Sequence, residues 1–391
     1  MRIGFALEAA ASWLGGANYL RSLIGAILSV PGRPATPVLF AAPGEAERWQ
    51  AEFPTSEVVA TRLLERGSGA WLVRKLLLRP TGIDAGLRAL ARRHRIDLLS
   101  HSGTLGLRAG TPTLCWIADL QHRRLPEFCD PAEFAAREAT IGRWQRDAAA
   151  LLFSSQAARA DFERFYAPGR TPLHVVPFVP STRTPDLANV PFVLERLGIL
   201  QPFFYVPNQF WLHKNHRLVI EAALRLHKAG VAVQVVFTGA GDDYRGRGHL
   251  DSLRALAGPL EDRVRFLGVV AYEEVMALME GCIAVINPSL FEGWSTTVEE
   301  ARNLGKLVLL SDIDTHREQA PPRGVYFDAQ DADDLAHRMR EASAAFVPEM
   351  EASERNRHMP DVAARQRAFG AAYIRVAKSV VDGQNVGARA A

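Results

Sequence analysis

The chain has 391 residues, of which 48% are hydrophobic and 23% charged, which is typical of a soluble globular protein with two domains. The net charge of +3 at pH 7 is too small to indicate a nucleic-acid partner. Cys115, Cys129 and Cys282 lie far apart with no metal-ligand spacing, which argues against a disulfide framework and for reduced thiols in a cytoplasm.

The N-terminus indicates a first strand rather than a signal peptide. Glu8 places an acid inside what would be the apolar core of such a peptide. No uncharged apolar stretch in the sequence is long enough to span a bilayer. We therefore expect a cytoplasmic protein.

Strand-like and helix-like segments alternate along the first half of the chain. Strands are expected at residues 2–7, 37–40, 98–101, 112–117, 149–154 and 174–177. Helices are expected at residues 18–28 and 156–166. A loop through Gly15 and Gly16 would join the first strand to the first helix. The Pro-, Ser- and Thr-containing stretch at 180–191 is typical of a linker.

The same alternation restarts after this linker. Strands are expected at residues 203–207, 233–238, 264–267, 283–286 and 307–311, and helices at 217–229, 250–257, 272–280, from about 297, and at 362–381. Such alternation predicts parallel sheets with helices on both faces. The expected fold class is therefore α/β, with two Rossmann-like, doubly wound domains that face an inter-domain cleft. The domains would span residues 1–180 and 181–355, followed by a final helical segment at 356–391.

The segment FEGWSTTVEEA, from Phe291 to Ala301, carries two carboxylates, Glu292 and Glu300. It is typical of a loop that leads from a strand into a helix, at the sheet edge where open α/β folds bind ligands. The helix N-terminus suits an anion such as a diphosphate, and Glu300 is placed to accept from a ribose diol. The alternative is a capping box, in which Thr297 is the cap and Glu300 bonds back to its N–H group.

A second strand–loop–helix element carries Lys214. Asn208 and Asn215 suit turn and cap positions around it. Lys214 would project a charge at the first turn of the following helix, where a phosphate can meet it; the alternative is an ordinary solvated lysine. His213 and His216 have no third ligand nearby, so we expect no metal site.

Together these segments resemble the retaining glycosyltransferases of the GT-B fold, family 4 (glycosyl transferases group 1), and a bacterial polysaccharide subset within it. The motifs that carry the resemblance are the Gly15-Gly16 loop, Asp119-Leu120-Gln121-His122, the loop from Gln209 to Lys214, and Glu292-x7-Glu300 followed by Ala301 and Gly305-Lys306. The resemblance implies transfer of a sugar from a nucleotide diphosphate sugar to a hydroxyl of a saccharide or lipid-linked saccharide, with retained configuration. It implies no cofactor and no metal.

The resemblance also implies a role for each domain and residue. The N-terminal domain would meet the acceptor, the C-terminal domain would bind the nucleotide sugar, and the final helix would cross back onto the N-terminal domain. The implied catalytic residues are His122, Lys214 and Glu292. The implied donor-binding residues are Gly15, Gly16, Asn208, Gln209, Lys214, Gly293, Trp294, Ser295, Thr296, Thr297 and Glu300. A leaving phosphate oxygen would take the acceptor proton, so no separate base is implied.

The chain departs from the family at Gln209, where members usually have Arg. Gln keeps hydrogen bonding but loses the charge and the bidentate fork. Either Arg245 or Arg247 replaces that charge, or the site binds diphosphate less tightly. A non-catalytic nucleotide- or glycan-binding protein of the same fold therefore stays open as the alternative function. A dinucleotide-dependent oxidoreductase is disfavoured, because Gly239-Ala240-Gly241 continues to Tyr244 where a third Gly is needed.

The segment 71–95 is rich in Arg with interleaved Leu. One interpretation is that it lies on the anionic inner face of the plasma membrane, near a lipid-linked acceptor. The other is a solvated helix face against the domain core.

Overall fold

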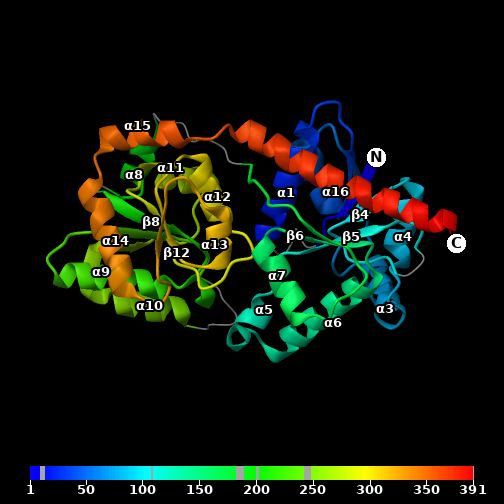
Figure 1. Cartoon of the computed structure of the whole chain (residues 1–391), viewed down its shortest axis with the longest axis horizontal. Helices are drawn as coiled ribbons and strands as arrows, with labels where there is room; N and C mark the ends of the chain where they lie inside the picture. Colours follow the sequence, from blue (N-terminus) through cyan, green and yellow to red (C-terminus); the bar gives the residue numbers. More distant parts are fainter. Residues whose placement is uncertain (9–13, 107–108, 182–188, 200–201, 242–247, 391) are drawn as a thin grey trace. The chain divides into compact units, whose positions relative to one another are not determined.

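The computed structural model describes residues 1–8, 14–106, 109–181, 189–199, 202–241 and 248–390 (Figure 1). The chain forms two compact units. The first comprises Met1–Leu120, Pro131–Ser181 and Ala363–Ala391, and the second comprises Gln121–Asp130 and Thr182–Val362. Among the described residues, no helix is both long and apolar enough to cross a membrane.

The first unit is built on a seven-stranded parallel sheet with the strand order β3-β2-β1-β4-β5-β6-β7. Its strands are β1 (Arg2–Ala6), β2 (Thr36–Ala41), β3 (Glu57–Ala60), β4 (Leu98–Ser100), β5 (Thr113–Ile117), β6 (Ala150–Phe153) and β7 (Leu173–Val175). Its helices are α1 (Leu14–Ser29), α2 (Pro43–Glu52), α3 (Gly69–Thr81), α4 (Ala85–Arg93), α6 (Pro131–Asp147), α7 (Gln156–Phe165) and α16 (Val362–Ala390).

Buried strands and capped helices explain the local structure of this unit. After the first residue, every residue of β1 and β2 is buried, as expected for parallel strands covered on both faces. Three helices begin at a polar side chain that accepts a hydrogen bond from the helix backbone. These N-caps are Ser68 of α3, Asp84 of α4 and Ser155 of α7.

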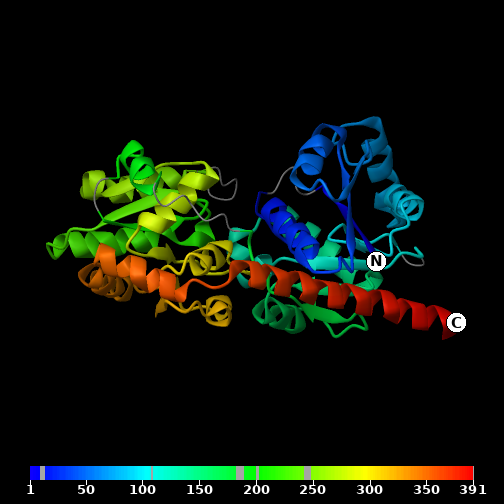
Figure 2. The ribbon, with the colours of Figure 1, turned by 90° about the horizontal axis from the view of Figure 1, so that it is seen from above.

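The last helix, α16, packs on α1 within the first unit (Figure 2). A Cβ atom on Gly370 would collide with the carbonyl oxygen of Ala26, so the two helices approach each other as closely as glycine permits. The hydroxyl of Tyr373 donates to Ser100 Oγ at 2.7 Å, at the end of β4. These contacts attach the last helix to the first sheet.

The second unit is built on a six-stranded parallel sheet with the strand order β10-β9-β8-β11-β12-β13. Its strands are β8 (Phe203–Pro207), β9 (Gln234–Thr238), β10 (Val264–Phe266), β11 (Val285–Asn287), β12 (Val308–Ser311) and β13 (Gly324–Phe327). Its α-helices are α5 (Gln121–Arg124), α8 (Val190–Arg196), α9 (His216–Lys228), α10 (His249–Ala257), α11 (Tyr272–Gly281), α12 (Thr296–Asn303), α13 (Asp314–Gln319), α14 (Ala332–Ala345) and α15 (Pro348–His358). Short 3-10 helices are η2 (Pro126–Phe128), η4 (Leu212–Lys214) and η5 (Gly258–Arg263).

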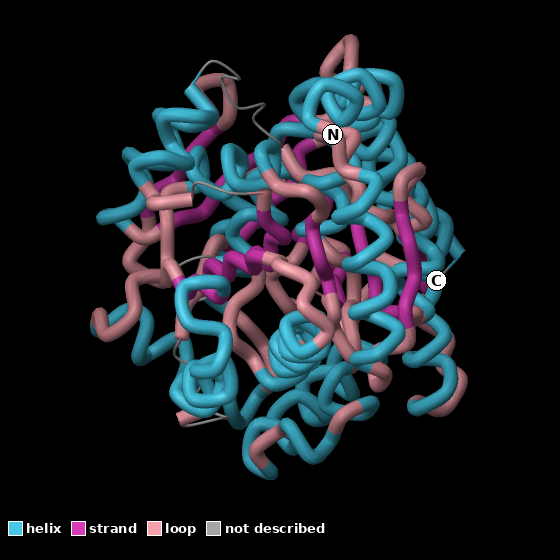
Figure 3. The backbone as a smooth tube through the Cα atoms, turned by 90° about the vertical axis from the view of Figure 1, so that its left-hand side faces the viewer, coloured by secondary structure: helices cyan, strands magenta, loops and turns pink. Residues whose placement is uncertain are grey.

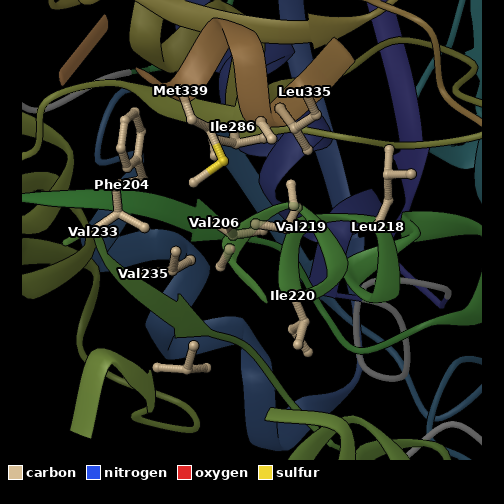
Figure 4. Close-up of a cluster of buried hydrophobic side chains, with 14 of the residues drawn as sticks. Phe204, Val206, Leu218, Val219, Ile220, Val233, Val235, Ile286, Leu335 and Met339 are labelled. Atoms are coloured by element: carbon tan, nitrogen blue, oxygen red, sulfur yellow. The ribbon is translucent and has the colours of Figure 1, made fainter. Parts of the chain in front are cut away.

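Two hydrophobic clusters cover the two faces of the second sheet. One packs α9, α10 and α14 against the strands, and Figure 4 shows its side chains from β8, α9 and α14 meeting in the core. The other packs α8, α11 and α12 against the opposite face. Figure 3 shows the same layering, with helices in cyan on either side of magenta strands. The sheet is therefore buried on both faces, and its chemistry is confined to its edges.

These two sheets confirm the predicted α/β fold class of two Rossmann-like domains. The predicted cleft between the domains stays a prediction. One expectation was wrong: Gly15 and Gly16 belong to the first turn of α1, which begins at Leu14, rather than to a loop. The predicted domain boundaries stay a prediction; the contacts of α5 group this short helix with the second unit.

Candidate active site

The polar residues singled out in the second unit gather where three adjacent strands end. β8, β11 and β12 are neighbours in a parallel sheet, so their carboxyl ends lie at the same edge. The chain after β8 leads to Lys214, the chain after β11 leads to Glu292, and the chain after β12 leads into α13. The sheet topology thus brings together segments that are up to 100 residues apart.

Lys214 and Glu292 form a buried ion pair at this edge. Lys214 Nζ lies 2.7 Å from Glu292 Oε1, and the two side chains are 13% and 8% exposed. Burial raises the pKa of Glu292, but its charge interactions, led by that with Lys214, outweigh burial, so the pKa lies below its usual value. Glu292 is therefore ionised, and Lys214 is not an ordinary solvated lysine.

The loop between β11 and α12 is held by its own polar side chains. Asn287 Nδ2 donates to Ser295 Oγ at 2.7 Å, which joins the two ends of the loop. Ser289 Oγ lies 2.8 Å from Asn287 Oδ1 and 2.7 Å from Glu292 Oε1. These bonds fix the position of the Glu292 carboxylate before any ligand arrives.

Helix α13 holds the same loop from outside. Thr315 Oγ1 donates to the backbone oxygen of Glu292 at 2.7 Å. Gln319 bonds to both backbone groups of Ser295: its Nε2 donates to the carbonyl oxygen at 2.9 Å, and its Oε1 accepts from the N–H group at 3.3 Å. All four residues are buried, so α13 fixes both ends of the segment from Glu292 to Ser295.

His316 of α13 is fully buried near the Lys214–Glu292 ion pair. Its Nδ1 lies 2.9 Å from the carbonyl oxygen of Ser311, so Nδ1 carries the proton and donates. Burial lowers the pKa of His316, although the charge of Glu292 opposes this effect. The ring is therefore neutral near pH 7, and its Nε2 has no hydrogen-bond partner among the described residues.

Glu300 lies one turn into α12, and its carboxylate is buried. The hydroxyl of Tyr272 donates to Glu300 Oε1 at 3.0 Å, and burial raises the pKa of Glu300 to about 7. The capping-box interpretation is wrong, because Ser295 caps α12 by accepting from the N–H of Val298. Glu300 is thus not engaged in capping, and its carboxylate titrates near neutral pH.

Asn208 follows β8 and packs against the loop after β9. Its carbonyl oxygen lies 3.2 Å from His216 Nε2, and a Cβ atom on Gly239, which has a φ of 145°, would collide with this same carbonyl. Asn208 Oδ1 is buried and has no hydrogen-bond partner within the described ranges. Such an atom is expected to gain a partner when a ligand or water binds. Thr297 Oγ1 lies nearby, 3.5 Å from the carbonyl oxygen of Pro207.

His122 lies on the short helix α5 and is buried. The neighbouring Gln121 bonds through its Nε2 to His213 Nδ1 at 2.9 Å, and Arg124 forms an ion pair with Asp314 at 3.2 Å. The His122 segment is thereby attached to the residue that precedes Lys214 and to the first residue of α13. This explains why the contacts group α5 with the second unit.

The remaining predicted residues occupy different places. Gly293 and Ser295 are buried in the loop, and Trp294 and Thr296 are half-buried beside them. Gln209 is half-buried directly after Asn208. Gly15 and Gly16 belong to the first unit, and their predicted approach to a ligand stays a prediction. Arg245 and Arg247, proposed to replace the missing charge, lie outside the described residues.

Several residues of this site were not predicted from the sequence. They are Asn287, Tyr272, Thr315 and Gln319. The one available signal was the density of polar residues directly after the apolar strand β12. No group of three or more metal-ligating side chains occurs in the part of the chain that the structure describes.

Comparison with known proteins finds a family model that matches most of the second unit. Residues 200–356 match the model of the glycosyl transferases group 1 family. We call this matching part of the chain the group 1 domain. The domain contains Lys214, Glu292 and Glu300, and it includes α13. No curated protein matches the chain in sequence.

Solved structures match the group 1 domain and the first unit together. A glycosyltransferase from Rickettsia africae ESF-5 has a TM-score of 0.68 at 13% identity, over 97% of this chain and 98% of that one. Anabaena Alr3699/HepE, in complex with UDP and glucose, has a TM-score of 0.64 at 17% identity, over 99% and 100%. Sucrose-phosphate synthase from Thermosynechococcus elongatus has a TM-score of 0.66 at 15% identity, over 100% of both chains. These similarities show that the chain has the GT-B fold.

Proposed function

We propose that the protein is a retaining glycosyltransferase, which moves a sugar from a nucleotide diphosphate sugar to a hydroxyl of a saccharide or lipid-linked saccharide. The observation that carries this proposal is the buried Lys214–Glu292 pair, which lies in the group 1 domain together with the carboxylate of Glu300. The same proposal includes independence of metal, a role in polysaccharide synthesis, and a cytoplasmic location at the inner face of the plasma membrane.

Glu300 and α12 are the proposed binding site of the nucleotide. An ionised Glu300 accepts hydrogen bonds from the two ribose hydroxyls, and the Tyr272 hydroxyl holds the carboxylate in place. The backbone N–H groups at the start of α12, with Thr297, face the diphosphate, since helix N-termini favour anions. Asn208 and Gln209 line the approach from β8.

Lys214 is the proposed electrostatic catalyst. Negative charge grows on the diphosphate as it leaves, and a lysine and a helix N-terminus stabilise that charge without a metal. Glu292 holds the lysine at 2.7 Å, so the cation is in place before the donor binds. Such preorganised charge is most effective in a buried site, where water screens it least.

The proposed reaction keeps the configuration of the transferred sugar. The bond between the anomeric carbon and the diphosphate oxygen breaks, and the acceptor oxygen bonds to the anomeric carbon on the same face. The departing phosphate oxygen takes the acceptor proton. Glu292 is therefore proposed to accept from donor sugar hydroxyls, with the backbone of Gly293 to Thr296, and not to act as a nucleophile.

His122 is proposed to act near the transferred sugar, and Gly15 and Gly16 to approach the diphosphate. Support for His122 comes from the bond of its neighbour Gln121 to His213, next to Lys214. Closure of the N-terminal domain onto the donor would bring the glycines to the same ligand.

A thermal-shift screen of UDP-, GDP-, ADP- and dTDP-sugars tests the proposal, because a tight ligand raises the melting temperature by mass action. The UDP held by Anabaena HepE makes UDP-sugars the first to test. Release of the nucleoside diphosphate from a stabilising donor would support an enzyme. If a donor stabilises the protein but no nucleoside diphosphate is released with any acceptor tested, the alternative is favoured. The protein would then be a non-catalytic binding protein, in which Gln209 has replaced a needed arginine.

A further inference from the structure

Helix α3 presents an exposed apolar face. Leu72, Val73, Leu76 and Leu77 are 49%, 57%, 66% and 52% exposed. Their spacing of one, four and five residues places them on the same side of a helix. We call these four residues the apolar face of α3. Contiguous exposed apolar patches are uncommon on soluble proteins and often mark interaction surfaces.

The orientation of α3 is fixed by the residues on its other side. Arg74 is buried and bonds to both carboxylate oxygens of Asp84, at distances of 2.8 to 3.1 Å. The Glu8 carboxylate accepts from Trp71 Nε1 at 2.9 Å and forms ion pairs with Arg74 at 3.0 Å and Lys75 at 2.7 Å. Ser68 caps the start of the helix. These ion pairs and the N-cap hold α3 in this orientation, with its apolar face exposed.

The segment that contains this face is basic. Residues 62–95 contain nine Lys and Arg against two acidic residues, Glu65 and Asp84; two of the nine, Arg74 and Lys75, are paired with Asp84 and Glu8. Arg92, Arg93 and Arg95, at the end of α4, are exposed. An exposed apolar face within a basic segment fits a partner that is both apolar and anionic.

The charge and the side chains decide among three occupants. A second copy of the chain would bring two strongly basic surfaces together across a symmetric interface, which repulsion disfavours. A nucleic acid would satisfy the charge but would leave the aliphatic side chains without an apolar environment. A bilayer of anionic lipids satisfies both, because Leu and Val enter the boundary below the headgroups while Arg and Lys meet the phosphates.

We propose that the apolar face of α3 binds an anionic membrane surface. This proposal deepens the proposed function, on which it rests for the membrane as the place where a lipid-linked acceptor is met. The ion pairs of Arg74 with Asp84 and Glu8 already fix the orientation of α3, so that binding to the membrane requires no refolding of the first unit.

Vesicle flotation with the full chain tests this surface without any donor or acceptor. The vesicles are phosphatidylcholine alone, and phosphatidylcholine with phosphatidylglycerol. The test variant is L72Q/L76Q, because Gln keeps helix propensity while it removes the apolar contact. The matched control is F192Q/V269Q, which replaces two residues of the second unit that are 61% and 76% exposed.

We expect the wild-type chain and the control to bind the anionic vesicles, and L72Q/L76Q to bind them at least about tenfold more weakly. Wild-type binding to neutral vesicles should be weak, and high salt should reduce binding to anionic ones. Equal binding of wild type and L72Q/L76Q would overturn the proposal, as would no binding of the wild type to either vesicle. A wild-type dimer that L72Q/L76Q dissociates in analytical ultracentrifugation would instead identify a second copy as the occupant.

The melting temperature and its shift with donor show whether L72Q/L76Q is folded. They also separate the two proposals. Vesicle binding without any donor-induced shift would remove the proposed function and leave the membrane surface standing. A donor-induced shift without vesicle binding would support donor binding and overturn the membrane surface.

Discussion

Glu300 is the residue whose substitution best separates donor binding from a structural role. Its carboxylate is buried, it accepts from the Tyr272 hydroxyl, and its pKa rises from the usual 4.5 to about 7. This change corresponds to on the order of 3 kcal/mol against the ionised form in the folded protein. The folded protein therefore contains an ionisable carboxyl that lowers its stability when it is ionised.

The pH dependence of stability follows from this shift. Below about pH 4.5 the carboxyl is protonated in both states. Between about 4.5 and 7 the folded protein keeps the proton and the unfolded chain loses it, so the free energy of unfolding falls as pH rises through this window. Glu300→Gln never ionises, so near pH 8 the variant should be more stable than the wild type by up to about 3 kcal/mol. Near pH 4 the two should be nearly equal. Urea unfolding followed by circular dichroism measures both.

Donor affinity is expected to change in the opposite direction. The ionised carboxylate accepts from the ribose diol, and such charge-assisted bonds contribute about 1.5–3 kcal/mol, so Glu300→Gln should weaken donor binding roughly ten- to a hundredfold near pH 8. Wild-type affinity should rise as pH increases through about 7, and the variant should lack this rise. Titration calorimetry with the donor found by thermal shift gives both values.

Tyr272→Phe provides a matched control, because it keeps the ring and removes the hydroxyl that lowers the pKa of Glu300. The midpoint of the affinity profile should move to higher pH. If Glu300→Gln binds donor as tightly as the wild type at every pH, the ribose assignment is wrong. If the variant is also no more stable near pH 8, the carboxylate is not under the burial penalty inferred here.

Three further substitutions test the rest of the site. Lys214→Met should lower turnover by about 100- to 1000-fold, while wild-type activity should survive EDTA; an activity that EDTA abolishes and Mg²⁺ restores would contradict this account. Gln319→Leu removes the acceptor of the buried Ser295 N–H group and one of two donors to the Ser295 carbonyl oxygen, so unfolding free energy should fall by about 1–3 kcal/mol and donor affinity should fall with it, as calorimetry would show. His122→Ala should lower kcat more than it raises the donor Kd; the reverse pattern would make His122 a ground-state binding residue.

The sequence predicted the buried elements well, because buried strands are continuous apolar runs. The strand predicted at 203–207 is β8 without change. The two strands that were missed, β3 and β13, lie at the edges of their sheets and are largely half-buried, so their residues carry a weaker pattern. Gly15 and Gly16 were assigned to a loop because glycine is a poor helix former, yet α1 includes both. Packing of the buried side of α1 outweighs the low helix propensity of glycine, and a local sequence pattern does not reveal such packing.

The start of α12 shows where local reasoning fails. Ser295, Thr296 and Thr297 stand in a row, and each is a good N-cap, so the sequence alone allows three registers of the helix. The register matters, because a cap at Thr297 would make Glu300 part of the capping box. In the structure Gln319 bonds to both backbone groups of Ser295, and Asn287 donates to its hydroxyl, so Ser295 is the cap.

The choice of register is therefore made 24 residues away, by Gln319 of α13. Once Ser295 is the cap, Glu300 is excluded from capping and is left with the Tyr272 hydroxyl in a buried site, which raises its pKa. Thr315 fixes the other end of the loop through the backbone of Glu292. The chemistry of both carboxylates thus depends on α13, so substitutions in α13 should alter donor affinity and the pH profile even though none of its residues is proposed to touch the donor.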